Sequence, residues 1–327
     1  MSNREFLSVC LFIIFWWLIY SFEVKYIISW IKQKTFTKSK LASIIHVLAI
    51  AGIVCLAHSY FIEPYWIDVR HVHIHSNKLI NTSLTIVQIS DLHCDKKIRN
   101  ENELIQVINA IKPDVIVFTG DAINTHEALP KFKKTLASLQ ANLGKFAVRG
   151  NFDVWHPKNP NLFKDTGFKE LDAELVSLKK KDARFSIMGI GVDNNFRDTS
   201  FLKRMNENDY NILLFHYPGI NEELPDVPVD LFLSGHTHGG QISLPFYGAL
   251  VTLSKYGKKY ESGRYNIGQR ILYVNRGIGM EGGFAPRIRF WARPEITVFH
   301  IEPKEEIQLN PNSKNTKNSS ADNLLLD

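Results

Sequence analysis

The sequence predicts an α/β fold, with a parallel β-sheet covered by helices, preceded by two N-terminal transmembrane helices. Three observations support this prediction. Two long apolar runs occupy the first 62 residues, apolar strands then alternate with segments of helical spacing, and several strands end in polar residues. Alternation of strands and helices is typical of a parallel sheet. The 327 residues suffice for one large α/β domain or two small ones.

The composition is that of an ordinary folded protein, with 45% hydrophobic and 22% charged residues. The three cysteines, Cys10, Cys55 and Cys94, have neither paired nor metal-type spacing. We therefore expect no disulfide framework. Cys94 stands beside His93, and we interpret it as a packing residue, with a redox role as the alternative.

The first apolar run, Phe6–Phe22, has about 17 residues, which is the lower limit for crossing a bilayer. The second run, Leu41–Ile62, has about 22 residues and is long enough to span. A cleaved signal peptide is the alternative for the first run, and a buried core helix is the alternative for the second. No cleavage-like site follows the first run, so we favour a two-helix membrane anchor over residues 1–66.

Lysines dominate the segment between the two runs, where Glu23 is the only acidic residue. These lysines are Lys25, Lys32, Lys34, Lys38 and Lys40. By the positive-inside rule this segment is cytoplasmic, and everything after residue 62 lies on the outer side of the membrane. If the first run instead lies in the interface, the assignment of sides must be reopened.

Residues 67–303 read as one domain, and residues 304–327 as a disordered tail that is rich in Asn, Ser and Lys. The domain opens with Asp68–His75, in which His71, His73 and His75 share one face if the segment is a strand. A metal-binding face is possible there, but we favour a solvated strand face.

Apolar, β-branched runs predict the later strands. They are Leu84–Ser90, Val115–Phe118, Lys145–Val148, Arg184–Val192, Asn211–Phe215, Val229–Leu233, Ile271–Val274 and Ile296–Ile301. Apolar residues at helical spacing predict the helices. They are Glu103–Ile111, Leu129–Leu143 and the short Phe201–Glu207.

Seven residues with oxygen or imidazole donors follow five of these strands. They are Asp91, His93, Asp121, Asn151, His216, His236 and His238. Each alone could be a helix cap or a turn residue, but ligands of open α/β sheets bind where strands end. Carboxylate, amide and imidazole donors without thiolate suit Mn²⁺, Fe, Zn²⁺ or Mg²⁺. Seven donors suffice for two ions if one carboxylate bridges, which is the arrangement used for in-line attack at phosphorus.

The order of these motifs resembles the calcineurin-like metallophosphoesterase superfamily. The motifs are Asp91-Leu92-His93, Gly120-Asp121, Gly150-Asn151-Phe152-Asp153, His216 and Gly235-His236-Thr237-His238. The resemblance implies a four-layer α/β/β/α sandwich that binds two divalent ions, with Mn²⁺ preferred. It further implies the ligand sets: Asp91, His93 and His238 for one ion, Asn151, His216 and His236 for the other, and Asp121 between them. The catalytic residues would be Asp121, Asn151 and His216.

The apolar N-terminus, Gly239-Gly240-Gln241 and Arg276-Gly277 look like the bacterial membrane-associated branch of that superfamily. That branch implies a location at the bacterial inner membrane and a lipid-linked phosphodiester or pyrophosphate substrate. We favour hydrolysis of UDP-2,3-diacylglucosamine to lipid X and UMP, a step of lipid A biosynthesis. Because a UDP-sugar is made in the cytoplasm, this substrate conflicts with the predicted outer location. A general phosphodiesterase and a catalytically silent metal-binding scaffold are the alternatives.

Phe152 departs from the superfamily pattern, which has a histidine at this position. That histidine stabilises the transition state or protonates the leaving group, and phenylalanine can do neither. A pyrophosphate substrate has a good leaving group and tolerates this loss better than an alkyl ester does. His156 is a weak candidate to replace the missing acid. The alternative is that His156 is a histidine of a surface loop without a catalytic role.

The segment 255–293 carries nine basic residues against Glu261 and Glu281. They are Lys255, Lys258, Lys259, Arg264, Arg270, Arg276, Arg287, Arg289 and Arg293. This segment predicts either a solvated basic surface or a surface for an anionic headgroup beside the bilayer. Nucleic acid is not expected as a partner, because no recognition motif is present.

Overall fold

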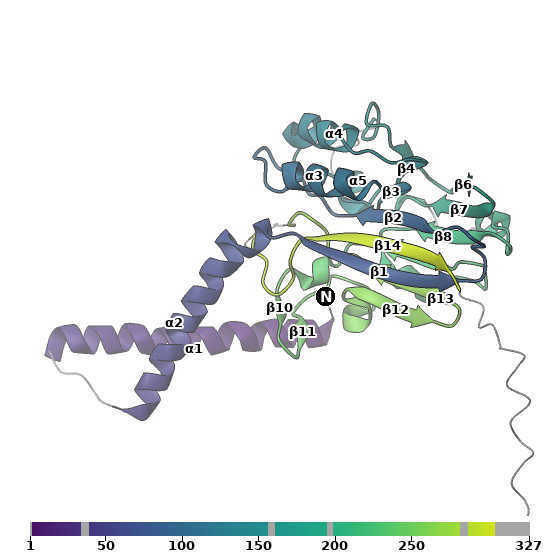
Figure 1. The fold of residues 1–327 in the computed structure, drawn as a ribbon. Helices are drawn as coiled ribbons and strands as arrows, with labels where there is room; N and C mark the ends of the chain where they lie inside the picture. The colour runs from purple at the N-terminus through teal and green to yellow at the C-terminus, as the bar shows by residue number, and fades with distance from the viewer. Residues whose placement is uncertain (1, 34–38, 156–160, 195–198, 282–286, 305–327) are drawn as a thin grey trace, which may run out of the picture.

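The computed structural model describes residues 2–33, 39–155, 161–194, 199–281 and 287–304. Two long helices precede a domain built on two β-sheets (Figure 1). The predictions for His156 and for most of the tail therefore lie outside the described residues, as do Lys34 and Lys38.

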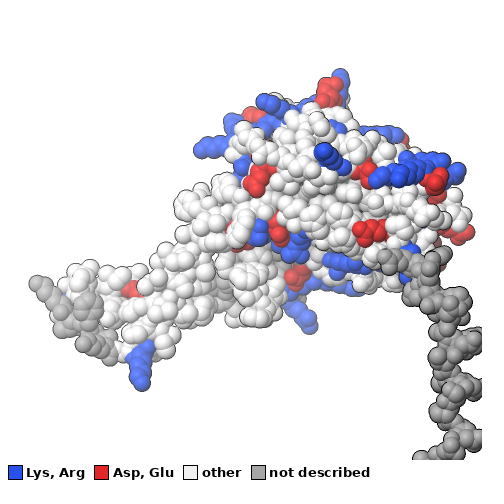
Figure 2. Space-filling model, in the orientation of Figure 1, with Lys and Arg blue, Asp and Glu red and all other residues white. Residues whose placement is uncertain are grey.

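The two N-terminal helices are α1 (Asn3–Gln33) and α2 (Lys40–Phe61). Both are long and apolar enough to cross a membrane, judged by length and composition alone. Most of their apolar side chains are exposed, and in Figure 2 their surface is almost free of charge. Helix α1 is longer than its apolar run, so Lys25 and Lys32 belong to the helix and not to a loop.

Both helices contact the domain at one end. The first turn of α1 does so through Glu5, whose Oε1 accepts the backbone N–H and the hydroxyl of Thr252, at 2.9 and 2.8 Å. After α2, the carboxylate of Glu63 accepts the N–H of Ala292 at 2.7 Å. Both polar contacts lie in buried surroundings. The domain therefore meets the amino end of α1 and the carboxyl end of α2.

Two six-stranded sheets form the centre of the domain. The first sheet has, in spatial order, β1 (Asp68–Ser76), β14 (Glu295–Pro303), β2 (Leu84–Ile89), β3 (Val115–Phe118), β4 (Gly144–Ala147) and β5 (Lys169–Glu170). The second has β12 (Gly263–Ile267), β13 (Arg270–Val274), β9 (Leu231–Ser234), β8 (Tyr210–Leu214), β7 (Ala183–Gly189) and β6 (Glu174–Lys180). A small hairpin, β10 (Ser243–Leu244) and β11 (Gly248–Ala249), stands apart from both sheets.

Helices cover the outer face of the first sheet (Figure 1). They are α3 (Glu101–Ile111), α4 (Leu129–Ala137), the short α5 (Asn151–Trp155) and the 3₁₀ helix η2 (His126–Ala128). Short 3₁₀ helices pack near the second sheet. They are η3 (Ser200–Arg204), η4 (Pro218–Glu222) and η6 (Gly257–Tyr260). Two further 3₁₀ turns are η1 (Glu63–Tyr65) and η5 (His238–Gly240). The four-layer arrangement is confirmed, with a fourth layer of 3₁₀ helices and loops.

The strand pattern explains the layers. In β3, Ile116 and Phe118 face the helices, whereas Val115 and Val117 face the second sheet. This alternation follows from the two-residue repeat of a strand, and it lets one short apolar run contribute to two cores. A third core, which includes Phe232, lies on the outer face of the second sheet.

The sheets are mixed, so the predicted parallel sheet is correct only in part. Strands β2 to β5 are parallel, but β14 runs antiparallel to β2. Helix α4 ends at Ala137, earlier than predicted, and the predicted helix over Phe201–Glu207 is the 3₁₀ helix η3. Strands β5, β6, β10, β11 and β12 were not predicted.

The three histidines of β1 share one face, as predicted, and that face is solvent-exposed. The rings of His71 and His73 stack against His300 of β14 at 5.2 and 4.7 Å between centroids. Nδ1 of His71 and Nε2 of His300 also form a hydrogen bond at 2.9 Å, so two of these rings are partners of each other on the exposed face. This supports the interpretation as a solvated strand face.

Strand direction places the two N-terminal helices and the strand ends at the same edge of the domain. Strand β1 is parallel to β14, which is antiparallel to β2. The chain therefore enters β1 from α2 at the edge where β2, β3 and β4 end (Figure 1). The candidate ligands follow those strand ends.

Candidate metal centre

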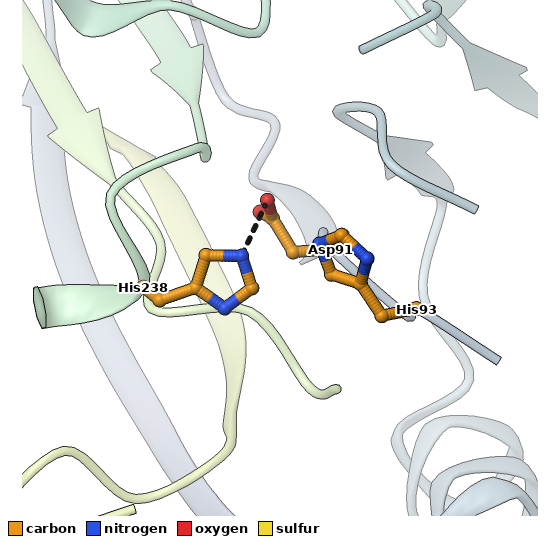
Figure 3. A group of neighbouring side chains, drawn as sticks. All are labelled: Asp91, His93 and His238. Atoms are coloured by element: carbon orange, nitrogen blue, oxygen red, sulfur yellow. Dashed lines mark ion pairs between the residues drawn. The ribbon is translucent and has the colours of Figure 1, made fainter. Parts of the chain in front are cut away.

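The structure brings the predicted ligands together from five strand ends. The loops after β2, β3, β4, β8 and β9 supply Asp91 and His93, Asp121, Asn151, His216, and His236 with His238, respectively. Six of the seven are buried and His236 is half-buried. Figure 3 shows the side chains of Asp91, His93 and His238 turned toward one another.

Backbone strain concentrates in these loops. Asp91, His93, Asp121, His236 and His238 all have positive φ, between 39 and 73°. Positive φ is uncommon for residues other than glycine, and strained backbone clusters at functional sites. Five of the seven candidate ligands are therefore held in a conformation that their own sequence does not favour.

Two glycines allow the loops to approach closely. A Cβ atom at Gly235 would collide with the carboxylate of Asp91, and one at Gly150 would collide with the carboxylate of Asp121. The glycines in the Gly-His-x-His and Gly-Asn motifs are thus required by contact with the neighbouring loop.

Hydrogen bonds fix two of the imidazole rings. Nδ1–H of His93 donates to Oδ1 of Asn124 at 2.9 Å, which leaves Nε2 with its lone pair. In the same way, Nδ1–H of His216 donates to the carbonyl of Thr119 at 2.7 Å. Such partners orient a ligating histidine and select its tautomer. Sequence reasoning missed Asn124, and its position three residues after Asp121 was the only available signal.

Loops near the two N-terminal helices support the other two histidines. Nε2 of His236 lies 3.4 Å from the carbonyl of Leu253. His238 lies against Arg289, whose Nη2 is 3.5 Å from Nδ1. Arg289 is fully buried, and its guanidinium donates to the carbonyls of Arg276, Gly277, Gly279 and Ala292. Burial lowers the pKa of Arg289 to about 9.

The donor set fits divalent metal ions. Nε2 of His93 and Nε2 of His238 are buried and make no hydrogen bond within the described part of the chain, but they lie 3.6 and 3.3 Å from carboxylate oxygens of Asp121 and Asp91. Donor atoms of His93, His238 and Asp91 lie within 4.8 Å of one another. A second group with the same spacing joins Asp91, Asp121 and His216. Buried nitrogens without a partner are costly unless a further group satisfies them. Nε2 of His216 also lies 3.1 Å from Oδ1 of Asn151.

Charges in the centre are strongly coupled. Burial acts to raise the pKa of Asp91, but His238, His216 and His93 together hold that pKa below its usual range. Burial lowers the pKa of His93 to about 4. For His216 burial also acts to lower the pKa, but attraction by Asp121 and Asp91 raises it to about 10.

Metal affinity should therefore rise with pH. At neutral pH the metal-free site holds a proton on His216, and a metal must displace it, whereas His93 is already neutral. We expect the apparent Mn²⁺ affinity to increase about tenfold per pH unit between about pH 6 and 9, with release of one proton. Calorimetry in buffers of different ionisation enthalpy measures that proton. A pH-independent affinity would contradict this assignment.

Asp153 holds two of the ligand loops together. Its carboxylate accepts the backbone N–H groups of Asp121, Ala122 and Gly150, at 2.9, 2.8 and 2.8 Å. Burial and the charge of Asp121 raise the pKa of Asp153 to about 7. Asp153 is the last residue of the Gly150-Asn151-Phe152-Asp153 motif, but the sequence did not reveal its three contacts.

We expect Asp153→Ala to lower the free energy of unfolding by about 3 kcal/mol, because it leaves three buried N–H groups without an acceptor. Denaturant titration of the full chain in detergent, without metal, measures this change. Asp182→Ala, at an exposed turn, is the matched control and should change stability by less than about 0.5 kcal/mol. Equal stability of the two variants would show that Asp153 does not hold the loops.

Phe152 occupies the edge of the centre. Its backbone N–H donates to Oδ1 of Asp121 at 2.8 Å, and its ring meets the ring of His93 edge-on, 4.7 Å between centroids. Where the superfamily pattern has an imidazole, the structure therefore places an apolar ring that carries no proton to donate.

The basic segment does not form a surface of nine free charges. Arg276 and Arg289 are buried. Arg276 bridges the two sheets, since its guanidinium pairs with Glu295 at 2.5 Å and with Asp68 at 2.6 Å. Five others pair with carboxylates; they are Lys255, Lys258, Lys259, Arg287 and Arg293. Cys94 is buried, as expected of a packing residue.

Two stacked sheets with a cluster of carboxylate, amide and imidazole donors at their strand ends define a metallophosphoesterase. The family described as calcineurin-like phosphoesterase matches residues 84–240. The chain is 35% identical to an uncharacterized metallophosphoesterase, YkuE, of Bacillus subtilis, over 75% of this chain and 89% of that protein. The chain therefore belongs to the calcineurin-like metallophosphoesterase family and is a hydrolase.

Two named relatives are similar over most of their length. The UDP-2,3-diacylglucosamine pyrophosphatase LpxG of Chlamydia muridarum is 30% identical, over 66% of this chain and 82% of that protein. The phosphodiesterase YaeI of Escherichia coli is 27% identical, over 75% of this chain and 92% of that protein. The predicted family and its bacterial branch are confirmed.

Proposed function

We propose that this chain is a membrane-anchored phosphoesterase that uses two divalent ions to hydrolyse a phosphodiester or pyrophosphate bond of a lipid-linked substrate. The observation that carries the proposal is the convergence of seven donors from five strand ends, with Nε2 of His93 and Nε2 of His238 buried against carboxylate oxygens of Asp121 and Asp91, at 3.6 and 3.3 Å. Residues 1–66 would form the anchor and residues 67–303 the catalytic domain.

The ligand assignment follows the predicted sets. Asp91, His93 and His238 would hold one ion, and Asn151, His216 and His236 the other, with Asp121 shared. When bound, the ions would supply an acidified water and neutralise phosphoryl charge. Manganese is the expected metal, and Fe, Zn²⁺ or Mg²⁺ suit the same donors.

The chain's own groups would orient the metal-binding imidazoles and determine which leaving groups can depart. Asn124, the carbonyl of Thr119 and the carbonyl of Leu253 hold three imidazoles in place. Phe152 supplies no proton, so the leaving group must depart with little protonation. Aryl and nucleoside phosphates are such leaving groups, and this preference supports a pyrophosphate or activated diester as the substrate class.

Hydrolysis of UDP-2,3-diacylglucosamine to lipid X and UMP fits this class. Support comes from the leaving group, from the apolar helices and from similarity to the UDP-2,3-diacylglucosamine pyrophosphatases LpxG of Chlamydia muridarum and Chlamydia trachomatis, each 30% identical. This substrate requires the catalytic domain to face the cytoplasm from the inner membrane.

The arrangement of the helices favours a second candidate, a phosphodiesterase of the outer face. The amino end of α1 and the carboxyl end of α2 both contact the domain. If both helices cross, the lysine-rich segment between the two apolar runs lies on the opposite side, and the positive-inside rule then places the domain outside. Such an enzyme would take a lipid-linked diester available on that face.

Two measurements test the proposal. Protease treatment of spheroplasts, with a tag after residue 327, reports the side of the domain. Protection together with Mn²⁺-dependent release of UMP from UDP-2,3-diacylglucosamine supports the cytoplasmic substrate, whereas digestion eliminates it and supports the outer-face enzyme. Protein that is loaded with metal but turns over neither this lipid nor a bis-aryl phosphodiester would instead be a metal-binding scaffold.

A further inference from the structure

We propose that an apolar rim beside the metal centre rests in the interface of the bilayer that α1 and α2 cross. The rim consists of Phe246 and Tyr247 in the β10–β11 hairpin, Leu253 after it, and Trp291 in the loop before β14. The inference rests on the membrane anchoring in the proposed function and is independent of the hydrolytic reaction.

Exposure and backbone strain set these residues apart. Phe246 is fully exposed at the tip of its hairpin, and Leu253 and Trp291 are 53% and 65% exposed. All three have positive φ, at 65, 54 and 57°. Positions of this kind usually carry glycine, asparagine or aspartate. Three large apolar side chains in that conformation, all facing outward, indicate a surface that does not face water.

The hairpin lies at the level where the apolar run of α1 begins. The hydroxyl of Tyr247 is hydrogen-bonded to the hydroxyl of Ser8, two residues inside that run. Glu5, one turn earlier, binds Thr252. In Figure 1 the hairpin lies beside the amino end of α1. If α1 crosses the bilayer, Tyr247 is at the depth of the membrane interface, where tyrosine is enriched.

The second loop lies at the level where α2 leaves the membrane. The N–H of Arg289 donates to the carbonyl of Ser59 at 3.0 Å, and the N–H of Ala292 donates to Glu63. Trp291 stands between these two attached residues. The hairpin and this loop also pair with each other, because the N–H of Ser243 donates to the carbonyl of Phe290 at 2.8 Å. The rim is therefore one structure attached to both helices.

The bilayer is the occupant that these contacts favour. The rim continues the exposed apolar surface of α1 and α2. Its flank has the composition of a membrane interface, since Lys258 lies 4.0 Å from the centre of the Tyr247 ring and Arg293 lies 4.0 Å from that of Trp66. A protein partner would have to compete with lipid for this position.

The rim also determines where the metal centre lies. Leu253 accepts from His236, and Arg289 contacts His238, so the loops that carry the rim also support two candidate ligands. If the rim rests in the interface, the centre is at the bilayer surface. The ligand chemistry that fits is then the phosphate of a lipid head group, reached without extraction of the acyl chains.

Spin labelling in proteoliposomes tests the depth of the rim. Labels are placed singly through Phe246→Cys, Trp291→Cys, Ile13→Cys and Ile80→Cys, in a chain that carries Cys10→Ala and Cys55→Ala. Ile13 lies in α1, and Ile80 is an equally apolar, 68% exposed residue in the loop between β1 and β2. Collision rates with dissolved oxygen and with a polar nickel chelate then give the depth of each label.

We expect labels at 246 and 291 to collide at least about fivefold more with oxygen, relative to the chelate, than the label at 80, because oxygen concentrates in the apolar phase. If the labels at 246 and 291 have the same collision ratio as the label at 80, while the label at 13 has the ratio of a site in the bilayer, the rim does not contact the membrane. The proposed anchoring by α1 then still holds. If the label at 13 also has the same collision ratio as the label at 80, both the membrane contact of the rim and the membrane anchor are wrong.

Discussion

Replacing Asp121 by alanine should reduce Mn²⁺-dependent turnover of a bis-aryl phosphodiester by at least about 10³-fold, above the loss typical of a single transition-state contact. Asp121 is buried, its Oδ2 lies 3.2 Å from Nε2 of His216, and its backbone N–H is held by Asp153. It is the carboxylate assigned to both ions, so its loss should weaken both sites and the charge balance between them.

Two further measurements make this result specific. Metal content, determined after gel filtration, should fall from two ions per chain in Asp121→Ala. The exposed variant Asp182→Ala should retain both ions and turnover within about twofold. If Asp121→Ala keeps its turnover within about tenfold, the proposed shared ligand is wrong even if the protein still binds metal.

The clustering of the candidate ligands could be predicted because each one lies just beyond a buried strand. Val115–Phe118 is short and wholly apolar, so Asp121, three residues beyond it in the Gly120-Asp121 motif, had to lie at the sheet edge. The same reasoning located Asn151, His216 and the pair His236 and His238. Parallel strands end at one edge, and a sequence that marks five such ends also marks a common site.

The strands that were missed have no such signal. Strand β6 reads Glu-Leu-Val-Ser-Leu-Lys-Lys and lies at a sheet edge, as does β12. Edge strands carry charged residues and few buried ones, so their pattern resembles that of a loop. The burial of Arg289 was not predicted, for a different reason. Backbone carbonyls from several segments satisfy its guanidinium, and only the folded chain brings them together.

The groups that support the metal centre could not be predicted from the sequence either, because only the folded chain brings them together. Asn124 orients His93, and the carbonyl of Leu253 faces His236. Neither contact can be recognised from the type of residue at that position. A backbone carbonyl can be supplied by any residue. Candidate ligands are therefore visible in a sequence when their chemistry is specific, whereas the atoms that orient them are often not.

The second large effect concerns the missing acid. Phe152→His should raise the turnover of phosphodiesters that have poor, alkyl-type leaving groups by about 10-fold or more, since a positioned general acid contributes about 10²–10⁴. The side chain at 152 already lies at the edge of the centre, against His93, and its backbone N–H is fixed by Asp121. An imidazole there would bring the proton that phenylalanine lacks.

The dependence of rate on leaving-group pKa distinguishes this effect from a general gain in activity. With the native Phe152, rates should fall steeply as the leaving group becomes more basic; with Phe152→His the slope should flatten, while bis-aryl substrates change by less than about threefold. Phe152→Leu, which removes the ring without adding a proton donor, should keep the steep slope. Parallel slopes for native protein and Phe152→His, at equal metal content, would mean that the leaving group is protonated from another position.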